Sequence, residues 1–109
     1  MKRGDVVIVA AVGDYGKPRP AVVVQTDVFP ETYPSVVICQ MTSDIVDAPD
    51  FRITVEPNEG NGLRIRSQIM ADKPVTVRRE RIGQLAGRLA DADLSRLNIA
   101  LAFVVGLAD

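Results

Sequence analysis

Residues 5–12 have the sequence DVVIVAAV, a continuous apolar run in which valine is the commonest residue. A run of this kind is typical of a strand buried on both faces, or of the first strand of a small barrel. Residues 20–25, with the sequence PAVVVQ, predict a second buried strand that begins at Pro20, where a missing backbone donor is tolerated. The first quarter of the chain therefore indicates a β-rich core.

The middle of the chain continues in the same way. Strands are expected over residues 35–42, 51–55, 66–70, 74–77 and 82–85, of which residues 51–55 alternate apolar and polar side chains as a half-buried strand does. Prolines, glycines and acids between these segments predict exposed connections. Many short strands of this kind favour a mainly β architecture.

The last segment, residues 91–106, has the apolar spacing of a helix. Asp91 is the predicted N-cap, Asp93 lies in the first turn, where the helix dipole favours an acid, and Gly106 is the predicted stop. The second half of this helix is apolar nearly all round, whereas a surface helix needs only one apolar stripe. We therefore expect a second packing partner, another subunit, in preference to a helix sunk into its own core.

The composition is that of an ordinary folded protein, with 109 residues, 47% of them hydrophobic and 25% charged. This size predicts a single domain over residues 1–109. Because Cys39 is the only cysteine, a disulfide scaffold is excluded, and one thiol fits a reducing cytosol. No apolar run is long enough to span a membrane, so a cytoplasmic protein with no membrane partner is expected.

The chain contains no histidine. Ser-His-Asp and Cys-His catalysis are therefore excluded, and one cysteine without histidine cannot form a structural zinc site. We expect neither a metal nor a cofactor. Any catalysis must use carboxylates, arginine, lysine, hydroxyls, tyrosine or backbone groups.

Charge is unevenly distributed along the chain although its net value is only −1. Residues 44–59 are predominantly acidic, whereas residues 64–88 hold seven arginines and lysines against two acids. A local basic surface can bind phosphates even on a nearly neutral protein. The alternative is a solvated surface of strands and turns.

Two local features could carry chemistry. Arg19 stands between Pro18 and Pro20, which restrict the backbone and could hold a guanidinium ready for a bidentate phosphate contact. Thr42 and Ser43 lie where a buried strand enters an acidic loop, so their hydroxyls could donate to a phosphate oxygen. The alternatives are an arginine that covers a barrel end and hydroxyls that cap a turn.

Taken together, several segments resemble the MazF/PemK family, the toxins of type II toxin–antitoxin modules. The resemblance rests on KRGDVV at residues 2–7, RPAVVV at 19–24, Thr42-Ser43, Ser67-Gln68-Ile69 with Asp72-Lys73, and the C-terminal helix. It implies an SH3-like β-barrel of the MazF/PemK/CcdB type with a C-terminal α-helix, mainly β in class, assembled as a homodimer.

The resemblance also implies an activity, that of a metal-independent, sequence-specific endoribonuclease that cleaves single-stranded RNA, chiefly mRNA, and is inhibited by a cognate antitoxin. Arg19 and Thr42 match the family's catalytic residues. The candidate RNA-binding residues are Lys17, Ser43, Ser67, Gln68, Arg78, Arg79 and Arg81. The absence of histidine fits this activity, because RNA supplies its own nucleophile in the 2′-hydroxyl. RNA and an acidic antitoxin tail are expected to compete for the basic stretch over residues 64–81.

The chain departs from the family pattern at two places. The loop before Arg19 is short and offers Asp14, Tyr15 and Lys17, and Ser67 stands where many members carry an acid. Whether a carboxylate such as Asp14 or Asp44 takes part in proton transfer is left open. Two other functions are weighed, a non-catalytic CcdB-like toxin that binds a protein such as DNA gyrase and a plain SH3-like binding module. The pairing of Arg19 with Thr42 favours the nuclease.

Overall fold

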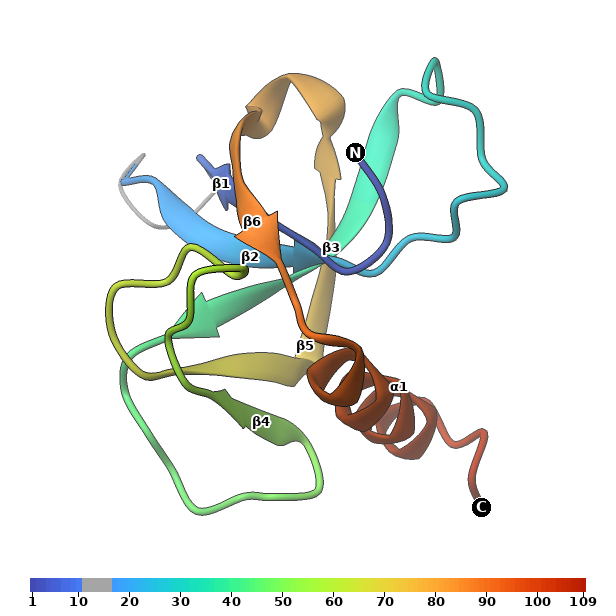
Figure 1. The fold of residues 1–109 in the computed structure, drawn as a ribbon. Coiled ribbons are helices and arrows are strands. Elements are labelled where there is room, and N and C mark those ends of the chain that lie inside the picture. The colour runs from blue at the N-terminus through green and yellow to red at the C-terminus, as the bar shows by residue number, and fades with distance from the viewer. Residues whose placement is uncertain (11–16) are drawn as a thin grey trace.

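The computed structural model describes residues 1–10 and 17–109, and in this part of the chain six strands form one antiparallel sheet (Figure 1). The strands are β1 (Asp5–Val9), β2 (Arg19–Val23), β3 (Ser35–Thr42), β4 (Arg52–Val55), β5 (Ser67–Arg78) and β6 (Ile82–Arg88). A single 3₁₀ turn, η1 (Arg79–Arg81), joins β5 to β6, and the helix α1 (Asp91–Val104) follows.

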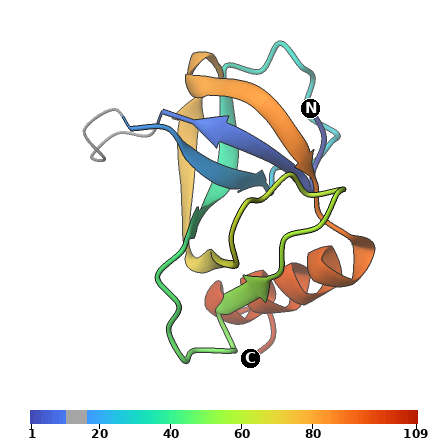
Figure 2. The same ribbon diagram turned by 60° about the vertical axis from the view of Figure 1, so that its left-hand side comes forward.

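The strand order is β4-β5-β3-β2-β1-β6, so β4 and β6 are the two edges. The sheet curls round on itself without closing, and α1 lies across one end of it beside β4 and β5 (Figures 1 and 2). The predicted mainly β class and barrel-like fold with a C-terminal helix are confirmed. No helix in the described ranges is long and apolar enough to cross a membrane.

Most strand predictions are confirmed in place, with two differences. The first strand ends at Val9, and residues 11–16, which include the end of its predicted range, lie outside the described residues. The two short strands expected over residues 66–70 and 74–77 are one strand, β5, of 12 residues. Its pairing with β3 shifts between Cys39↔Pro74 and Met41↔Ile69. This irregularity lets a proline lie inside the strand, because a bulge interrupts the ladder that proline cannot join.

Two apolar clusters fill the molecule. One lies inside the curl of the sheet and contains valines and Ile38 from β1, β2, β3 and β5. The other lies between the opposite face of the sheet and α1, and includes Met41, Ile69 and Leu97. This double burial explains why the strands at the N-terminus are apolar at successive positions rather than at alternate ones.

The helix differs from its prediction at the start and agrees at the end. Asp91 is not the N-cap, because Ala90 occupies that position and its carbonyl accepts the Leu94 amide, which leaves Asp91 in the first turn. Gly106 ends the helix with a φ of 81°, a left-handed conformation that glycine adopts without a steric penalty.

Only Leu97 and Ala100 of α1 are fully buried. Ile99 and Phe103 of the helix remain 72% and 48% exposed, and Leu107, just beyond its end, is 82% exposed. In this chain by itself, the helix therefore keeps an uncovered apolar side, as the sequence predicted.

Candidate functional site

Arg19 and Thr42 are brought to the same end of the sheet. Arg19 is the first residue of β2 and pairs with Val9, while Ala21 pairs with Gln40 of β3. Both residues lie at the same end of the sheet, because Arg19 is two residues before Ala21 in β2 and Thr42, the last residue of β3, is two residues after Gln40. Two positions that are 23 residues apart in the sequence therefore share one place in the fold.

Both residues line a cavity of about 320 Å³. Its polar lining consists of Lys17, Arg19, Thr42, Ser43, Arg64 and Ser67, and the remaining lining is largely apolar, from β1, Met41, residues 62–65 and Ala86 of β6. Four residues predicted to contact RNA or to act in catalysis, besides Arg19, are therefore at this one cavity. A concave site with a few convergent polar groups on an apolar wall is typical of a ligand site.

The hydroxyl of Thr42 is oriented by the turn that follows it. The backbone N–H of Asp44 donates to Thr42 Oγ1 over 3.1 Å. Because this contact uses a lone pair of the oxygen, the hydroxyl hydrogen stays available for donation. Thr42 is half-buried and Ser43 is exposed.

Ser67 and Gln68 are adjacent in β5 but face opposite sides of it, as successive strand residues do. Ser67 is buried, lines the cavity, and donates through Oγ to the carbonyl of Ile65 over 3.0 Å. Gln68 is 2% exposed and lines a different hollow, beside residues 45–49. The structure thus separates two residues that the sequence placed in one RNA-binding group.

The Gln68 carboxamide holds the loop that follows Thr42. Its Oε1 accepts from the Val46 amide over 3.1 Å, and its Nε2 donates to the Val46 carbonyl over 2.9 Å and to Thr54 Oγ1 over 3.1 Å. A buried side chain with three such bonds fixes the loop backbone. Gln68 therefore contacts the loop that follows Thr42, and it is not among the residues that line the cavity.

Arg64 lines the cavity but was predicted only as part of the basic stretch. It is carried by a turn built around Asn61, which is fully buried and whose Oδ1 accepts the backbone amides of Asn58 and Leu63. Gly62 has a φ of 69°, and a Cβ there would lie 2.1 Å from the Ala86 carbonyl oxygen. The Asn61-Gly62 pair predicts a turn at this point of the sequence. It does not predict that the turn packs against Ala86 of β6.

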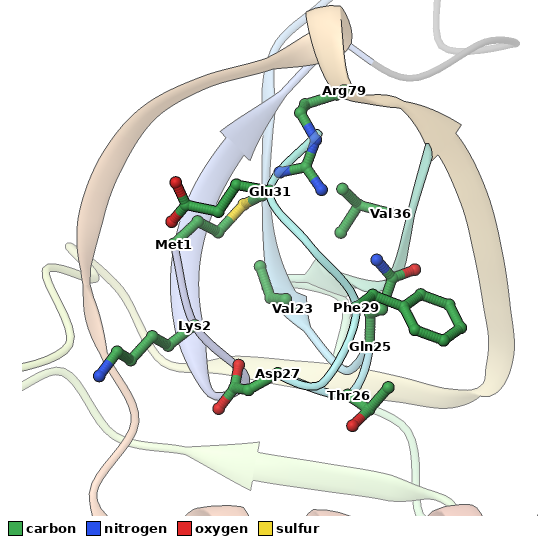
Figure 3. A pocket seen from close by; sticks show the side chains of 10 residues that line it. All are labelled: Met1, Lys2, Val23, Gln25, Thr26, Asp27, Phe29, Glu31, Val36 and Arg79. Carbon is green, nitrogen blue, oxygen red and sulfur yellow. The ribbon is translucent and has the colours of Figure 1, made fainter. Parts of the chain in front are cut away.

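Three arginines at the C-terminal end of the predicted basic stretch do not line this cavity, namely Arg78, Arg79 and Arg81. Arg78 pairs with Ser35 at the opposite end of β3 from Thr42, about 20 Å away along the strand. Arg79 donates to the Tyr33 carbonyl over 2.8 Å and points into a small cavity beside Met1 and Lys2 (Figure 3). Arg78 and Arg81 line another hollow, with Lys73. The basic stretch is thus not one continuous surface.

Of the two candidate carboxylates, Asp14 and Asp44, the structure describes only Asp44. Asp14 and Tyr15 lie outside the described residues. Asp44 supplies its backbone amide to Thr42, and its side chain is not part of the described lining.

Cys39 is buried, and burial raises the pKa of its thiol to about 12, so the thiol stays protonated. Residues 1–10 and 17–109 contain no group of three or more His, Cys, Asp or Glu side chains that could hold a metal ion.

This fold is shared with a known class of proteins. Residues 2–105 match the PemK-like, MazF-like toxins of type II toxin–antitoxin systems, and the chain belongs to this family. It is 42% identical over 109 residues to a protein of Mycolicibacterium smegmatis described as a probable endoribonuclease MazF, with 99% of each chain covered.

Solved structures agree with the fold. An endoribonuclease in complex with its cognate antitoxin, from a mycobacterial species, aligns with a TM-score of 0.80 at 22% identity and covers 98% of this chain and 96% of its own. A MazE–MazF complex from Deinococcus radiodurans aligns with a TM-score of 0.74 at 25% identity, over 97% and 96% of the two chains. Family membership favours the MazF-like reading over a CcdB-like toxin or a plain binding module.

Proposed function

We propose that this toxin is an endoribonuclease that cleaves single-stranded RNA without a metal, by attack of the RNA's own 2′-hydroxyl. The observation that carries the proposal is that Arg19 of β2 and Thr42 of the neighbouring strand β3 line one cavity. An arginine fork and an oriented hydroxyl on facing strands can both contact the same phosphate. The likeness to a probable endoribonuclease MazF supports it.

The proposed reaction is an intramolecular transesterification. The O2′–P bond forms as the P–O5′ bond breaks, the 2′-hydroxyl loses a proton, and the departing 5′-oxygen gains one. The products are a 2′,3′-cyclic phosphate and a 5′-hydroxyl. Since an arginine guanidinium stays protonated in proteins, Arg19 contributes positive charge and hydrogen bonds to the phosphoryl oxygens. The hydroxyl of Thr42 donates to a non-bridging oxygen, where removal of one such donor typically costs ~10²–10³ in rate.

The other lining residues are assigned to binding. Lys17 and Arg64 are exposed cations at the cavity and attract the RNA backbone. Ser43 offers an exposed hydroxyl, and Ser67, whose hydrogen is used on Ile65, offers its oxygen as an acceptor. Gln68 is assigned to positioning the loop beyond Thr42.

The assembly is proposed in the same way. The toxin acts in the cytoplasm as a single domain, it forms a homodimer through the uncovered apolar side of α1, and a cognate antitoxin neutralises it. The exposed Ile99, Phe103 and Leu107 support the homodimer, since burial of apolar surface is the main driving force of association. The antitoxin is supported by the family and by the antitoxin complex of a structurally similar endoribonuclease.

The test is cleavage of single-stranded RNA by the purified protein in EDTA. We expect cleavage to persist in the chelator and the products to carry 2′,3′-cyclic or 3′-phosphate and 5′-hydroxyl ends. A preparation of Arg19→Ala made in parallel controls for contaminating nucleases. Cleavage that disappears in EDTA and returns with Mg²⁺ would contradict the proposed mechanism.

A further inference from the structure

A second hollow, of about 330 Å³, lies on the half of β5 that leads to η1, and we name it the β5 groove. Its polar lining consists of Gln40, Lys73, Thr76, Arg78 and Arg81, over two valines of β5. The helix α1 lies at the other end of the molecule from η1 in both views (Figures 1 and 2). The groove is therefore separate from the apolar side of α1.

The groove is uniformly basic. Lys73, Arg78 and Arg81 are all exposed, and its described lining contains no carboxylate. The acid next to Lys73 is Asp72, which is held by Arg52 through a 2.9 Å ion pair. Glu80, the acid of η1, is not part of the lining either. Three cations with an amide and a hydroxyl, without a neutralising acid among them, form a surface suited to phosphate groups.

Two features of the sheet place the groove near the cavity of Arg19 and Thr42. Gln40 lies two residues before Thr42 on the same side of β3, about 7 Å from it along the strand. Arg81 donates through Nη1 to the carbonyl of Ala10 over 3.1 Å, and Ala10 follows Val9, the partner of Arg19 in the sheet. An extended chain that leaves the cavity along β3 thus meets the β5 groove.

Arg79 lies between Arg78 and Arg81 in the sequence, but it does not line the groove. Its side chain lines a different cavity, whose lining also includes Lys2 and the acids Asp27 and Glu31 (Figure 3). The chain therefore offers two pairs of one lysine and one arginine at different hollows. Lys73 and Arg78 line the β5 groove, whereas Lys2 and Arg79 line the cavity of Figure 3.

We propose that the β5 groove binds the phosphates of the RNA segment that flanks the cleaved bond, so that affinity depends on RNA length beyond the cleaved sequence. This inference rests on the proposed function, because it assumes that RNA occupies the Arg19–Thr42 cavity. The lining favours RNA over an acidic peptide. Phosphates recur at every nucleotide of a chain that already lies in the adjoining cavity, and hydroxyl and amide groups add donors to phosphate oxygens.

The test compares two RNAs, a short oligonucleotide that contains only the cleaved sequence and a longer one extended on both sides. The groove variant is Lys73→Gln with Arg78→Gln, and the matched control is Lys2→Gln with Arg79→Gln, which removes the same charges from the cavity of Figure 3. Arg81 is kept because it also holds Ala10. For the groove variant, kcat/KM on the long RNA should fall at least about tenfold, and the slope of log affinity against log salt should flatten by about 1.4.

On the short RNA, the groove variant should cleave as the wild type does, and the control variant should match the wild type on both RNAs. Cleavage of the short RNA shows that the catalytic proposal stands whatever happens to the long one. Equal effects of the groove variant on the two RNAs, or an equal loss in the control variant, would overturn the inference. A groove variant that cleaves the long RNA normally and binds only the antitoxin more weakly would overturn it as well, since the groove would then be a peptide site.

Discussion

Gln68 lies directly opposite Thr42 in the β3–β5 ladder, and its buried carboxamide binds both backbone groups of Val46, four residues beyond Thr42. The strand that faces Thr42 thus also fixes the loop that leaves it. Because Asp44, inside this loop, donates to the Thr42 hydroxyl, the orientation of that hydroxyl depends on a residue outside the cavity.

The first prediction concerns this positioning role. Gln68→Leu removes the two hydrogen bonds that hold the loop at Val46, so cleavage should fall about tenfold or more at a temperature where the protein is folded. The free energy of unfolding of this variant should be about 2–3 kcal/mol below that of the wild type. Gln25→Leu is the matched control, because Gln25 makes two similar bonds, to Ser35 and Val37, at the other end of β3. Urea unfolding and kcat measured on both variants check this. Equal losses of activity would show that Gln68 contributes only stability.

Arg19 and Thr42 carry the second prediction. Thr42→Val keeps the branched shape and removes the hydroxyl, and it should lower kcat by ~10²–10³. Thr26→Val is its control, because Thr26 Oγ1 accepts the Val28 amide over 3.2 Å in the same kind of turn, away from the cavity. Arg19→Lys should also be poor, since a point charge does not replace a planar fork. Single-turnover cleavage measures each, and wild-type rates in Thr42→Val would remove the hydroxyl from the mechanism.

A third prediction follows from the turn that carries Arg64. Gly62→Ala should be destabilising by about 1–3 kcal/mol, because the residue has a left-handed φ and the added Cβ meets the Ala86 carbonyl. RNA binding should weaken as Arg64 is displaced. Gly60→Ala, in the same turn, brings its Cβ no closer than 3.4 Å to a neighbour and should be far milder. Thermal unfolding and RNA binding by both variants are the measurements, and indistinguishable variants would contradict the assignment of Gly62.

The fourth prediction concerns pH. Burial would raise the pKa of Asp72, but the hydrogen bond and charge of Arg52, with the charge of Lys73, outweigh it and hold the pKa below its ordinary value. A carboxyl with a lowered folded pKa stabilises the protein above its unfolded pKa of about 3.9, and this stabilisation is lost as the pH falls through the folded pKa. Asp72→Asn should therefore be less stable than the wild type at neutral pH, with the gap closing in acid.

Urea unfolding at several pH values checks this prediction. Glu56→Gln is the control, because its ion pair with Arg66 is largely exposed and should contribute little at any pH. A gap between the wild type and Asp72→Asn that stays constant down to acid pH would show that the pair does not act through ionisation.

The fifth prediction concerns the apolar side of α1. Phe103→Asp should give a monomer, because a charge in a buried apolar contact is strongly unfavourable. Asn98→Asp adds the same charge at an exposed position of the same helix, turned about 140° away from Phe103 round the helix axis, and should leave the assembly unchanged. Light scattering at micromolar concentration measures both. A monomeric wild type would contradict the proposed homodimer.

The sequence by itself determined the elements of this protein and the family to which it belongs. The valine-rich runs at residues 5–12 and 20–25 predict buried strands because their apolar side chains are adjacent as well as alternate. Zero histidines and one cysteine removed whole classes of chemistry. The excess of apolar residues in α1 predicted that part of the helix surface would stay uncovered in a single chain. This could be predicted because helical periodicity and composition are local properties of the sequence. The motifs that indicated the family, including Arg19 and Thr42, are equally local.

Tertiary structure alone decided which of these residues share a place. Strand pairing brought Arg19 and Thr42 to one cavity, whereas Ser67 and Gln68, although adjacent in β5, line different hollows. The basic stretch is one block in the sequence, but Arg79 and Arg81 of η1 line different hollows. Local patterns fix how a segment folds, whereas the pairing of distant strands fixes its neighbours. That pairing depends on contacts of large sequence separation, which no single segment encodes.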